Sequence, residues 1–181
     1  MIYFTSDLHF YHANVIRHAN RPFSGADEMN QALINNWNQR VRMSDEVYIL
    51  GDVTLKGASY ANQILSLLHG RKYLIRGNHD RFTDQESFDK SLFIWIKDYH
   101  ELKHQKQRFI LFHYPIDRWN HFYRGSIHLH GHSHNFSDYN EQNAENGFRR
   151  IDVGVDAHHM APVSIDEIRA LFPLSETDVS V

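Results

Sequence analysis

Five short polar segments in this chain each follow an apolar run that is typical of a buried strand. The segments are Asp7-Leu8-His9, Gly51-Asp52, Gly77-Asn78-His79-Asp80, His113 and Gly131-His132-Ser133-His134. Strands that alternate with helices form an α/β sheet, where binding sites assemble at the carboxyl ends of the strands. We therefore expect side chains from five distant parts of the chain to converge on one site.

The apolar runs and helical patterns predict the order of the elements. Strands are predicted at 2–5, 47–50, 73–75, 109–112, 127–130 and 148–155, and helices at 24–41, 58–69 and 164–172. Ser24 with Asp27 and Ser164 with Glu167 have the spacing of a capping box at two of the helix starts. The segment 82–99 has the pattern of a helix followed by a strand near 93–96, and the polar stretch 137–147 that of a loop or hairpin tip.

The domain organisation follows from length and pattern. The chain has 181 residues and shows neither repeats nor a linker. We expect one α/β domain over residues 1–173 and a C-terminal tail, 174–181, that frays.

Composition excludes several classes of protein. The formal net charge is −3 without a basic cluster, so nucleic acid is an unfavoured partner. No signal peptide precedes the first strand, and no apolar run approaches the roughly 18 residues of a membrane span. With no Cys, the chain lacks disulfides and thiolate metal sites, which suits a cytoplasmic protein. The 15 His residues then favour metal ligation by nitrogen and oxygen.

Two pairs of candidate ligands have a spacing of two residues. Asp7 and His9 follow the first strand, and side chains at i and i+2 of an extended segment point the same way. Both can therefore reach one metal. His132 and His134 repeat this spacing around a small serine.

Three further ligands complete a set for two metals. Asp52 has two carboxylate oxygens and can bridge two cations, while Asn78 offers an amide oxygen and His113 an imidazole. Two divalent ions roughly 3.5–4 Å apart can polarise a phosphoryl group and ionise a water molecule. Oxygen and nitrogen donors favour manganese or iron, with zinc or nickel possible. Any one of these segments alone is equally an ordinary polar loop, whereas the ordered set is poorly explained that way.

In order and spacing the segments resemble the motifs D-x-H, G-D, G-N-H-[DE], H and G-H-x-H of the calcineurin-like metallophosphoesterase family. The opening stretch, residues 5–14, and Arg21-Pro22-Phe23 further resemble small stand-alone members from bacteria and phages. The resemblance implies a four-layer αββα sandwich with two mixed β-sheets and a dinuclear site at one edge.

The resemblance also assigns roles. It implies one metal held by Asp7, His9, Asp52 and His134, and another held by Asp52, Asn78, His113 and His132. A metal-bound hydroxide would attack phosphorus, His79 would stabilise the phosphoryl oxygens or protonate the leaving group, and Asp80 would orient its neighbours. The chain departs from the family's phosphoprotein phosphatases at Leu55, where they carry a second Asp that orients the catalytic His. A protein phosphatase is therefore disfavoured.

Substrate contacts are suggested by position alone. His12, Asn14 and Arg21 follow the first motif closely, and Arg81 follows the third, where a guanidinium could clamp a phosphate. A satisfied loop histidine and solvated or ion-paired arginines are equally reasonable explanations. The aromatic run 119–123 is either a stacking platform for a base or a satellite hydrophobic cluster, which is the commoner arrangement.

The favoured function is therefore a dinuclear-metal-dependent phosphoesterase that hydrolyses a small, nucleotide-like phosphomonoester or phosphodiester. One alternative is a nuclease with the same chemistry. Another is a non-catalytic metal-binding scaffold of the same fold, which we expect to have lost ligands that this chain retains.

Overall fold

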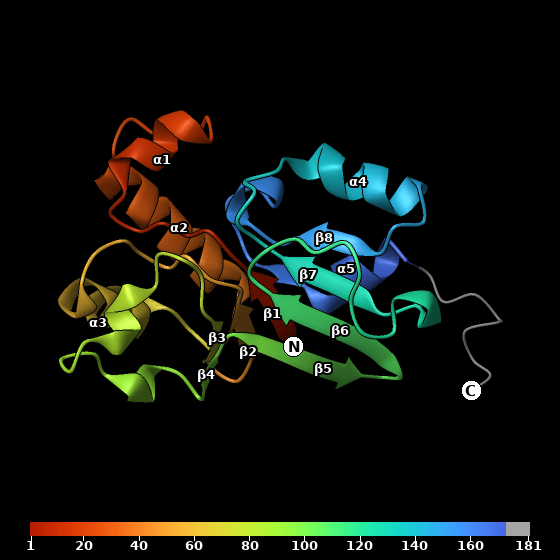
Figure 1. Cartoon of the computed structure of the whole chain (residues 1–181). Helices are drawn as coiled ribbons and strands as arrows, with labels where there is room; N and C mark the ends of the chain where they lie inside the picture. The colour runs from red at the N-terminus through yellow and green to blue at the C-terminus, as the bar shows by residue number, and fades with distance from the viewer. Residues whose placement is uncertain (173–181) are drawn as a thin grey trace.

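The computed structural model describes residues 1–172 and contains nine strands and five α-helices in that part of the chain (Figure 1). The strands are β1 Ile2–Thr5, β2 Glu46–Ile49, β3 Arg71–Ile75, β4 Ile96–Lys97, β5 Tyr99–His104, β6 Gln107–Phe112, β7 Ile127–His130, β8 Arg150–Asp152 and β9 Val163–Ser164. The helices are α1 Ala13–His18, α2 Ala26–Arg40, α3 Ala58–Leu67, α4 Ser137–Glu145 and α5 Ile165–Ala170. The predicted domain end at 173 and the tail 174–181 lie outside the described residues.

The strands form two mixed sheets, as predicted. One sheet has the order β4-β3-β2-β1-β9, in which β9 alone runs antiparallel to its neighbour. The other has the order β5-β6-β7-β8, in which β5 is antiparallel to β6. The parallel strands β1, β2 and β3 carry their carboxyl ends to one edge, as do β6 and β7. The ligand segments follow these ends.

Alternation along β2 separates two hydrophobic cores. Val47 and Ile49 face a core that the first sheet shares with α2 and α3. Tyr48 and Leu50 face a second core between the two sheets, to which α5 also contributes. With α4 packed against β8 on the far side, the layers follow the predicted order α, β, β, α (Figure 1).

Helix α2 follows from its sequence pattern. Met29, Leu33 and Trp37 recur every four residues and are buried in the first core. Truncating such a side chain to alanine costs about 2–5 kcal/mol of folding stability. The helix starts two residues later than predicted, and Glu28, not Asp27, is the partner of Ser24, whose backbone N–H donates to the carboxylate at 2.8 Å. The predicted capping box at Ser164 and Glu167 is confirmed.

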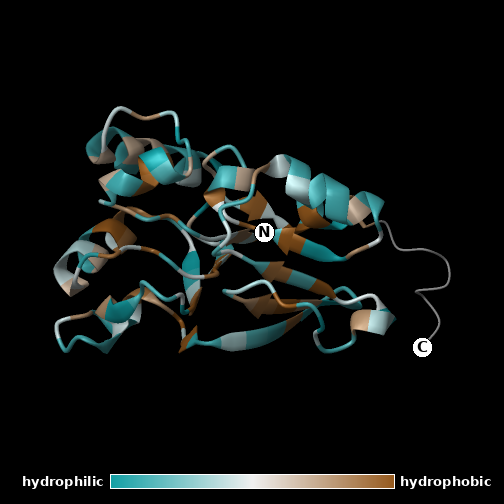
Figure 2. Ribbon diagram, turned by 45° about the horizontal axis from the view of Figure 1, so that its top comes forward, coloured by the Kyte–Doolittle hydropathy of each residue, from teal (hydrophilic) through white to brown (hydrophobic). Residues whose placement is uncertain are grey.

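Helix α4 occupies the stretch that we predicted to be a loop or hairpin tip. It is mostly hydrophilic (Figure 2), so it lacks the apolar stripe that identifies a helix in the sequence. Asn140 attaches it to the edge strand β8: the Asn140 side chain donates to the carbonyl oxygen of Asp152 and accepts from its N–H, each at 2.8 Å. A polar contact therefore positions helix α4, and this helix also covers the edge of the sheet.

Other boundaries also differ from the prediction. The long strand predicted at 148–155 is only β8, and a 3₁₀ turn follows at Val155–Ala157. Segment 82–99 forms two 3₁₀ turns and β4 instead of a helix and a strand at 93–96. Strand β5, which has no apolar alternation, was not predicted. Among the described residues, no helix has the length and apolar character that crossing a membrane requires.

Candidate metal centre

The polar segments converge at the carboxyl ends of the parallel strands. They form two groups of ligand atoms, each within 4.8 Å of one another: Asp7, His9 and His134 in the first group, and Asp52, His113 and His132 in the second. Residues from opposite ends of the chain therefore meet because both sheets deliver their strand ends to the same place.

Asp52 belongs to the second group but also faces the first. Its Oδ2 is 3.6 Å from Nε2 of His9 in the first group and 3.6 Å from Nε2 of His113 in the second. The carboxylate thus faces both groups, which is the position that a bridging ligand requires. Asn78 joins the second group, since its Oδ1 is 3.0 Å from the same Nε2 of His113.

His9 is buried, and neither of its ring nitrogens has a hydrogen-bond partner among the described residues. Burial and the neighbouring His134 lower the pKa of its imidazole to about 2, so the ring is neutral and able to donate a lone pair. Buried polar groups without partners are rare in folded proteins. A metal ion would satisfy this ring.

The site also contains two buried carboxyl groups, whose charged form a bound cation would stabilise. Asp7 is fully buried, and burial together with the nearby Asp152 carboxylate raises its pKa well above the ordinary value. Asp52 is buried beside it. Carboxylate, imidazole and amide donors together fit hard-to-borderline divalent cations.

The ligand loops have an unusual backbone conformation. Asp7, His9, Asp52, His132 and His134 all have positive φ, between 49° and 70°. Non-glycine residues in this left-handed region are uncommon and cluster at functional sites. Long-range hydrogen bonds hold them, including the Asp7 N–H to the Gly51 carbonyl and the His9 N–H to the Asp52 carbonyl, each at 3.0 Å.

This backbone corrects the expectation from the i, i+2 spacing. Asp7 and His9 do fall in one group, but His132 and His134 fall in different groups. All four residues have positive φ, so neither segment is extended and the strand rule for residues i and i+2 applies to neither pair. His132 lies with Asp52 and His113, and His134 lies with Asp7 and His9.

Glycine lets the loops approach each other at two positions. A Cβ on Gly77 would lie 2.2 Å from Oδ1 of Asp52. A Cβ on Gly131 would lie 1.8 Å from the Ser6 hydroxyl oxygen and 2.5 Å from Oδ2 of Asp7. Any larger residue would displace a ligand, because these distances are shorter than a van der Waals contact.

Comparisons with known proteins agree with this geometry. A family model described as the calcineurin-like phosphoesterase superfamily domain matches residues 1–157. The chain belongs to this superfamily. It is 38% identical over 170 residues to an uncharacterized protein of Methanocaldococcus jannaschii, covering 92% of this chain and 88% of that one. It is 32% identical over 196 residues to the Gene 66 protein of Mycobacterium phage D29, covering 94% of each.

A solved structure shares the overall architecture. The crystal structure of a protein of unknown function from Aquifex aeolicus superposes with a TM-score of 0.71 at 28% identity. The match covers 95% of this chain and 99% of that one. The whole arrangement of two sheets and flanking helices therefore recurs in that protein.

In this phosphoesterase-superfamily chain, Asp80 joins the ligand loops. It is buried, and its carboxylate accepts hydrogen bonds from the backbone N–H groups of Gly77, Asp52 and Val53 at 2.8–2.9 Å. Burial raises the pKa of Asp80 to about 7, although these hydrogen bonds oppose the rise. Asp80 thus contacts the backbone that carries Asp52.

Arg21 lies beneath the first group of ligands. Its side chain is fully buried and donates to both carboxylate oxygens of Asp156, at 2.8 and 2.9 Å. It also donates to the carbonyl oxygens of Leu8 at 3.0 Å and Asp7 at 2.6 Å. Protein groups therefore occupy this guanidinium, as expected for an ion-paired arginine and not for a substrate contact.

Asp156 in turn orients a candidate ligand and was not anticipated from the sequence. Its Oδ2 is 2.8 Å from Nδ1 of His134. Burial alone would raise the pKa of Asp156, but the hydrogen bonds from His134 and Arg21 outweigh it and hold the pKa below its ordinary value. A carboxylate that accepts from Nδ1 leaves Nε2 of the same imidazole free for a metal. No local pattern identifies Asp156, because it lies 135 residues from Arg21.

His79 and His12 lie beside the ligands. The His79 side chain is 40% exposed, with Nε2 4.0 Å from Oδ2 of Asp52 and its backbone N–H donating to Oδ1 of the same carboxylate. Within residues 1–172 its ring has no hydrogen bond, and Leu55, at the position of the usual second Asp, is exposed. His12 has its ring centroid 5.5 Å from that of His9, and its buried Nδ1 has no partner among the described residues.

The other two predicted substrate contacts are exposed. Asn14 lies on α1, and Arg81 begins the 3₁₀ turn Arg81–Asp84 directly after Asp80. The aromatic run 119–123 forms a satellite cluster, in which Trp119 is buried against Phe122 and Phe148.

Proposed function

We propose that this protein is a dinuclear-metal-dependent phosphoesterase that hydrolyses a small, nucleotide-like phosphomonoester or phosphodiester. The position of Asp52 supports this proposal most strongly, since one carboxylate oxygen is equally close to an imidazole of each ligand group. Membership of the superfamily supports the same reaction class. The retained ligand set argues against a non-catalytic scaffold.

The candidate ligands form sets for two metal ions. The first ion would be held by Asp7, His9, Asp52 and His134, and the second by Asp52, Asn78, His113 and His132. We propose manganese or iron, with zinc or nickel as substitutes, because the donors are oxygen and nitrogen without sulfur. When bound, two such ions polarise phosphoryl oxygens and lower the pKa of water from about 15.7 toward roughly 7.

The surrounding side chains would perform the remaining tasks. His79 is exposed and faces the bridging carboxylate, so it can reach a phosphoryl oxygen or give a proton to the leaving alkoxide. Asp80 holds the two loops that carry Asp52 and Asn78. Asp156 holds the His134 imidazole in the orientation that presents Nε2.

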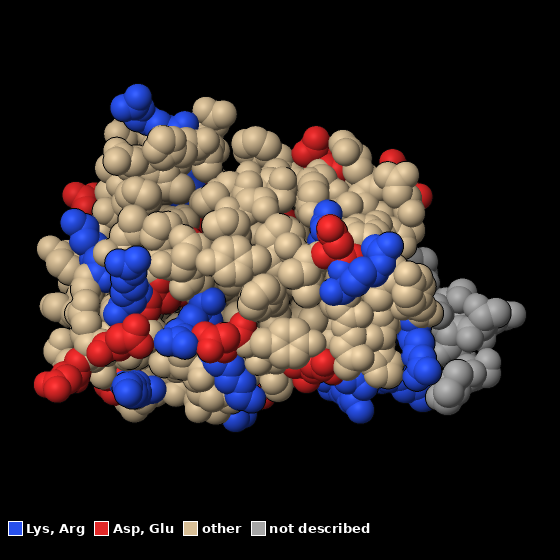
Figure 3. Space-filling model, viewed as in Figure 1, with Lys and Arg blue, Asp and Glu red and all other residues tan. Residues whose placement is uncertain are grey.

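The charge distribution favours a small substrate, and the composition favours a cytoplasmic protein. Acidic and basic side chains are interspersed on the face shown in Figure 3, without a field of one sign that would attract a polyanion. A phosphorylated small molecule therefore fits better than nucleic acid. The absence of Cys agrees with a reducing compartment.

The test is hydrolysis of p-nitrophenyl phosphate and its bis ester by metal-stripped protein, with manganese, iron, zinc or nickel added back singly. Asp52→Asn should abolish turnover, because it removes the shared ligand. Asp117→Asn is the matched control, since that carboxylate is 95% exposed and outside the site. Full activity of Asp52→Asn would refute the bridging role, and two bound metals without turnover of either ester would favour the scaffold.

A further inference from the structure

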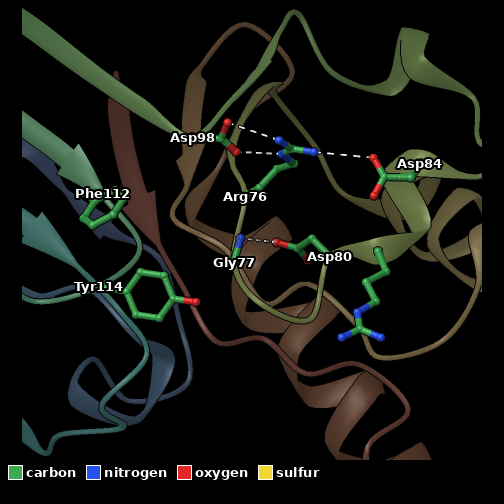
Figure 4. Close-up of a pocket in the computed structure, with 8 residues that line it drawn as sticks. Arg76, Gly77, Asp80, Asp84, Asp98, Phe112 and Tyr114 are labelled. Carbon is green, nitrogen blue, oxygen red and sulfur yellow. Dashed lines mark hydrogen bonds and ion pairs between the residues drawn. The ribbon is translucent and has the colours of Figure 1, made fainter.

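A cavity of about 290 Å³ opens beside the second ligand group (Figure 4). Its lining residues are Arg76, Gly77, Asp80, Arg81, Asp84, Asp98, Phe112 and Tyr114. The Tyr114 hydroxyl is 3.5 Å from Oδ1 of the candidate ligand Asn78. A group bound in this cavity would therefore adjoin anything held at the ligands.

One wall of the cavity is aromatic. Figure 4 shows Phe112 and Tyr114 on one side of the cavity and Asp84 on the other, with Arg76 between Asp98 and Asp84. Tyr114 is 37% exposed. It is supported by His132, with ring centroids 4.6 Å apart, and by Phe112, at 5.6 Å. Tyr114 is thus a fixed ring with an accessible surface beside the site.

The other lining side chains carry charges of both signs. Arg76 donates to both carboxylate oxygens of Asp98, at 2.8 and 3.1 Å, and lies 3.4 Å from Asp84. The Asp80 carboxylate is occupied by backbone N–H groups. Within residues 1–172, Arg81 is the cavity-lining cation for which no side-chain partner is found. The lining is not positive overall, since Asp80, Asp84 and Asp98 also line it, but Arg81 gives it one guanidinium that an anionic group could contact.

We infer that this cavity is the subsite for the nucleoside portion of the substrate, with the base packed against Tyr114 and Arg81 attracting the phosphate. The inference rests on the proposed function. Every base has a π-face that an aromatic ring can stack on. The volume is at the lower end for small-molecule pockets, so it suits one nucleoside and not a polymer.

The base contribution is measured by calorimetric titration of the metal-loaded full chain with AMP and with ribose 5-phosphate, which lacks the base. We expect AMP to bind roughly 5- to 100-fold more tightly, the usual range for stacking one base. Tyr114→Ala should abolish this preference. Tyr114→Phe should keep it, because the ring remains. Tyr123→Ala, which removes a ring that is 85% exposed elsewhere, should also leave it intact.

Arg81 is tested with the same two ligands. Arg81→Ala should weaken both by a similar factor, roughly tenfold, because both carry the phosphate. Equal affinity of wild type for AMP and ribose 5-phosphate would overturn the subsite, as would a preference that survives Tyr114→Ala. Unchanged binding of both ligands to Arg81→Ala would overturn the role of Arg81.

The failure of this inference differs from the failure of the proposed function. If only the subsite inference is wrong, metal-dependent hydrolysis of p-nitrophenyl phosphate is still observed. If the proposed function is wrong, no ester is hydrolysed, while the AMP preference and its dependence on Tyr114 persist.

Discussion

Replacing Arg21 by methionine separates an arginine that binds substrate from one that builds the site. The side chains of Arg21 and Asp156 are both fully buried and joined by two hydrogen bonds. Removing one partner of a buried ion pair costs about 3–5 kcal/mol, because the other charge stays buried without compensation. Since Asp156 would keep its contact with His134, we expect the lower end, about 3 kcal/mol.

Urea unfolding of the metal-free protein at pH 7.5 measures this loss. With a denaturant slope of about 2 kcal/mol per molar, the midpoint should fall by about 1.5 M. Arg17→Met is the matched control, because Arg17 is an exposed arginine on α1, and it should change stability by less than about 0.5 kcal/mol.

Metal binding supplies the second measurement. Arg21 supports Asp156 and the carbonyl oxygens of Asp7 and Leu8, so Arg21→Met should disturb the first ligand group. Losing such support typically reduces metal affinity 10- to 100-fold. Manganese titration should show one weakened site and a second site that changes less. Unchanged stability and metal affinity together with a raised KM would refute this reasoning and show that Arg21 contacts substrate.

Three further predictions concern catalysis, pH and packing. His79→Ala should keep both metals but slow turnover by about 10²–10⁴-fold, with a smaller loss for a nitrophenolate leaving group; an equal loss for alkyl and nitrophenyl esters would argue against proton donation. Burial and the neighbouring His130 lower the pKa of His128 to about 3, below its ordinary 6.5. Neutral His128 therefore contributes fully to the free energy of unfolding above pH 6.5, and this contribution is lost as the pH falls toward 3. About 2 kcal/mol is lost by pH 5. Urea titrations should show a shallower pH dependence for His128→Gln, and parallel profiles would contradict this origin. Gly131→Ala should weaken metal binding, because its Cβ would overlap the Ser6 hydroxyl; calorimetric affinity equal to wild type would show that the loop relaxes freely.

Strong local patterns predicted much of the fold. The strands β1, β2, β3, β6 and β7 appear where apolar runs precede the ligand segments. Helix α2 appears where a four-residue repeat forms an apolar stripe. In these elements local propensity and burial favour the same structure, so the sequence pattern is sufficient.

Elements without such a pattern were missed. Helix α4 is polar and is tied to β8 through Asn140, a contact that follows only once the sheet has formed. Strand β5 is paired along its whole length with β6, although its own residues show no alternation of buried and exposed positions. Pairing to a neighbouring strand supplied what the local sequence did not indicate.

The sequence by itself determined which donors the site contains, because ligand chemistry depends on residue type and strand ends converge in any sheet of this kind. Only the tertiary structure decided how these donors are divided. His132 and His134 fall in different groups although they are only two residues apart. Long-range contacts, such as the His132 N–H donating to the Asp7 carboxylate at 2.9 Å, hold their left-handed backbone against local preference. The pairing of Arg21 with Asp156 likewise joins residues 135 positions apart, and burial makes that pairing obligatory.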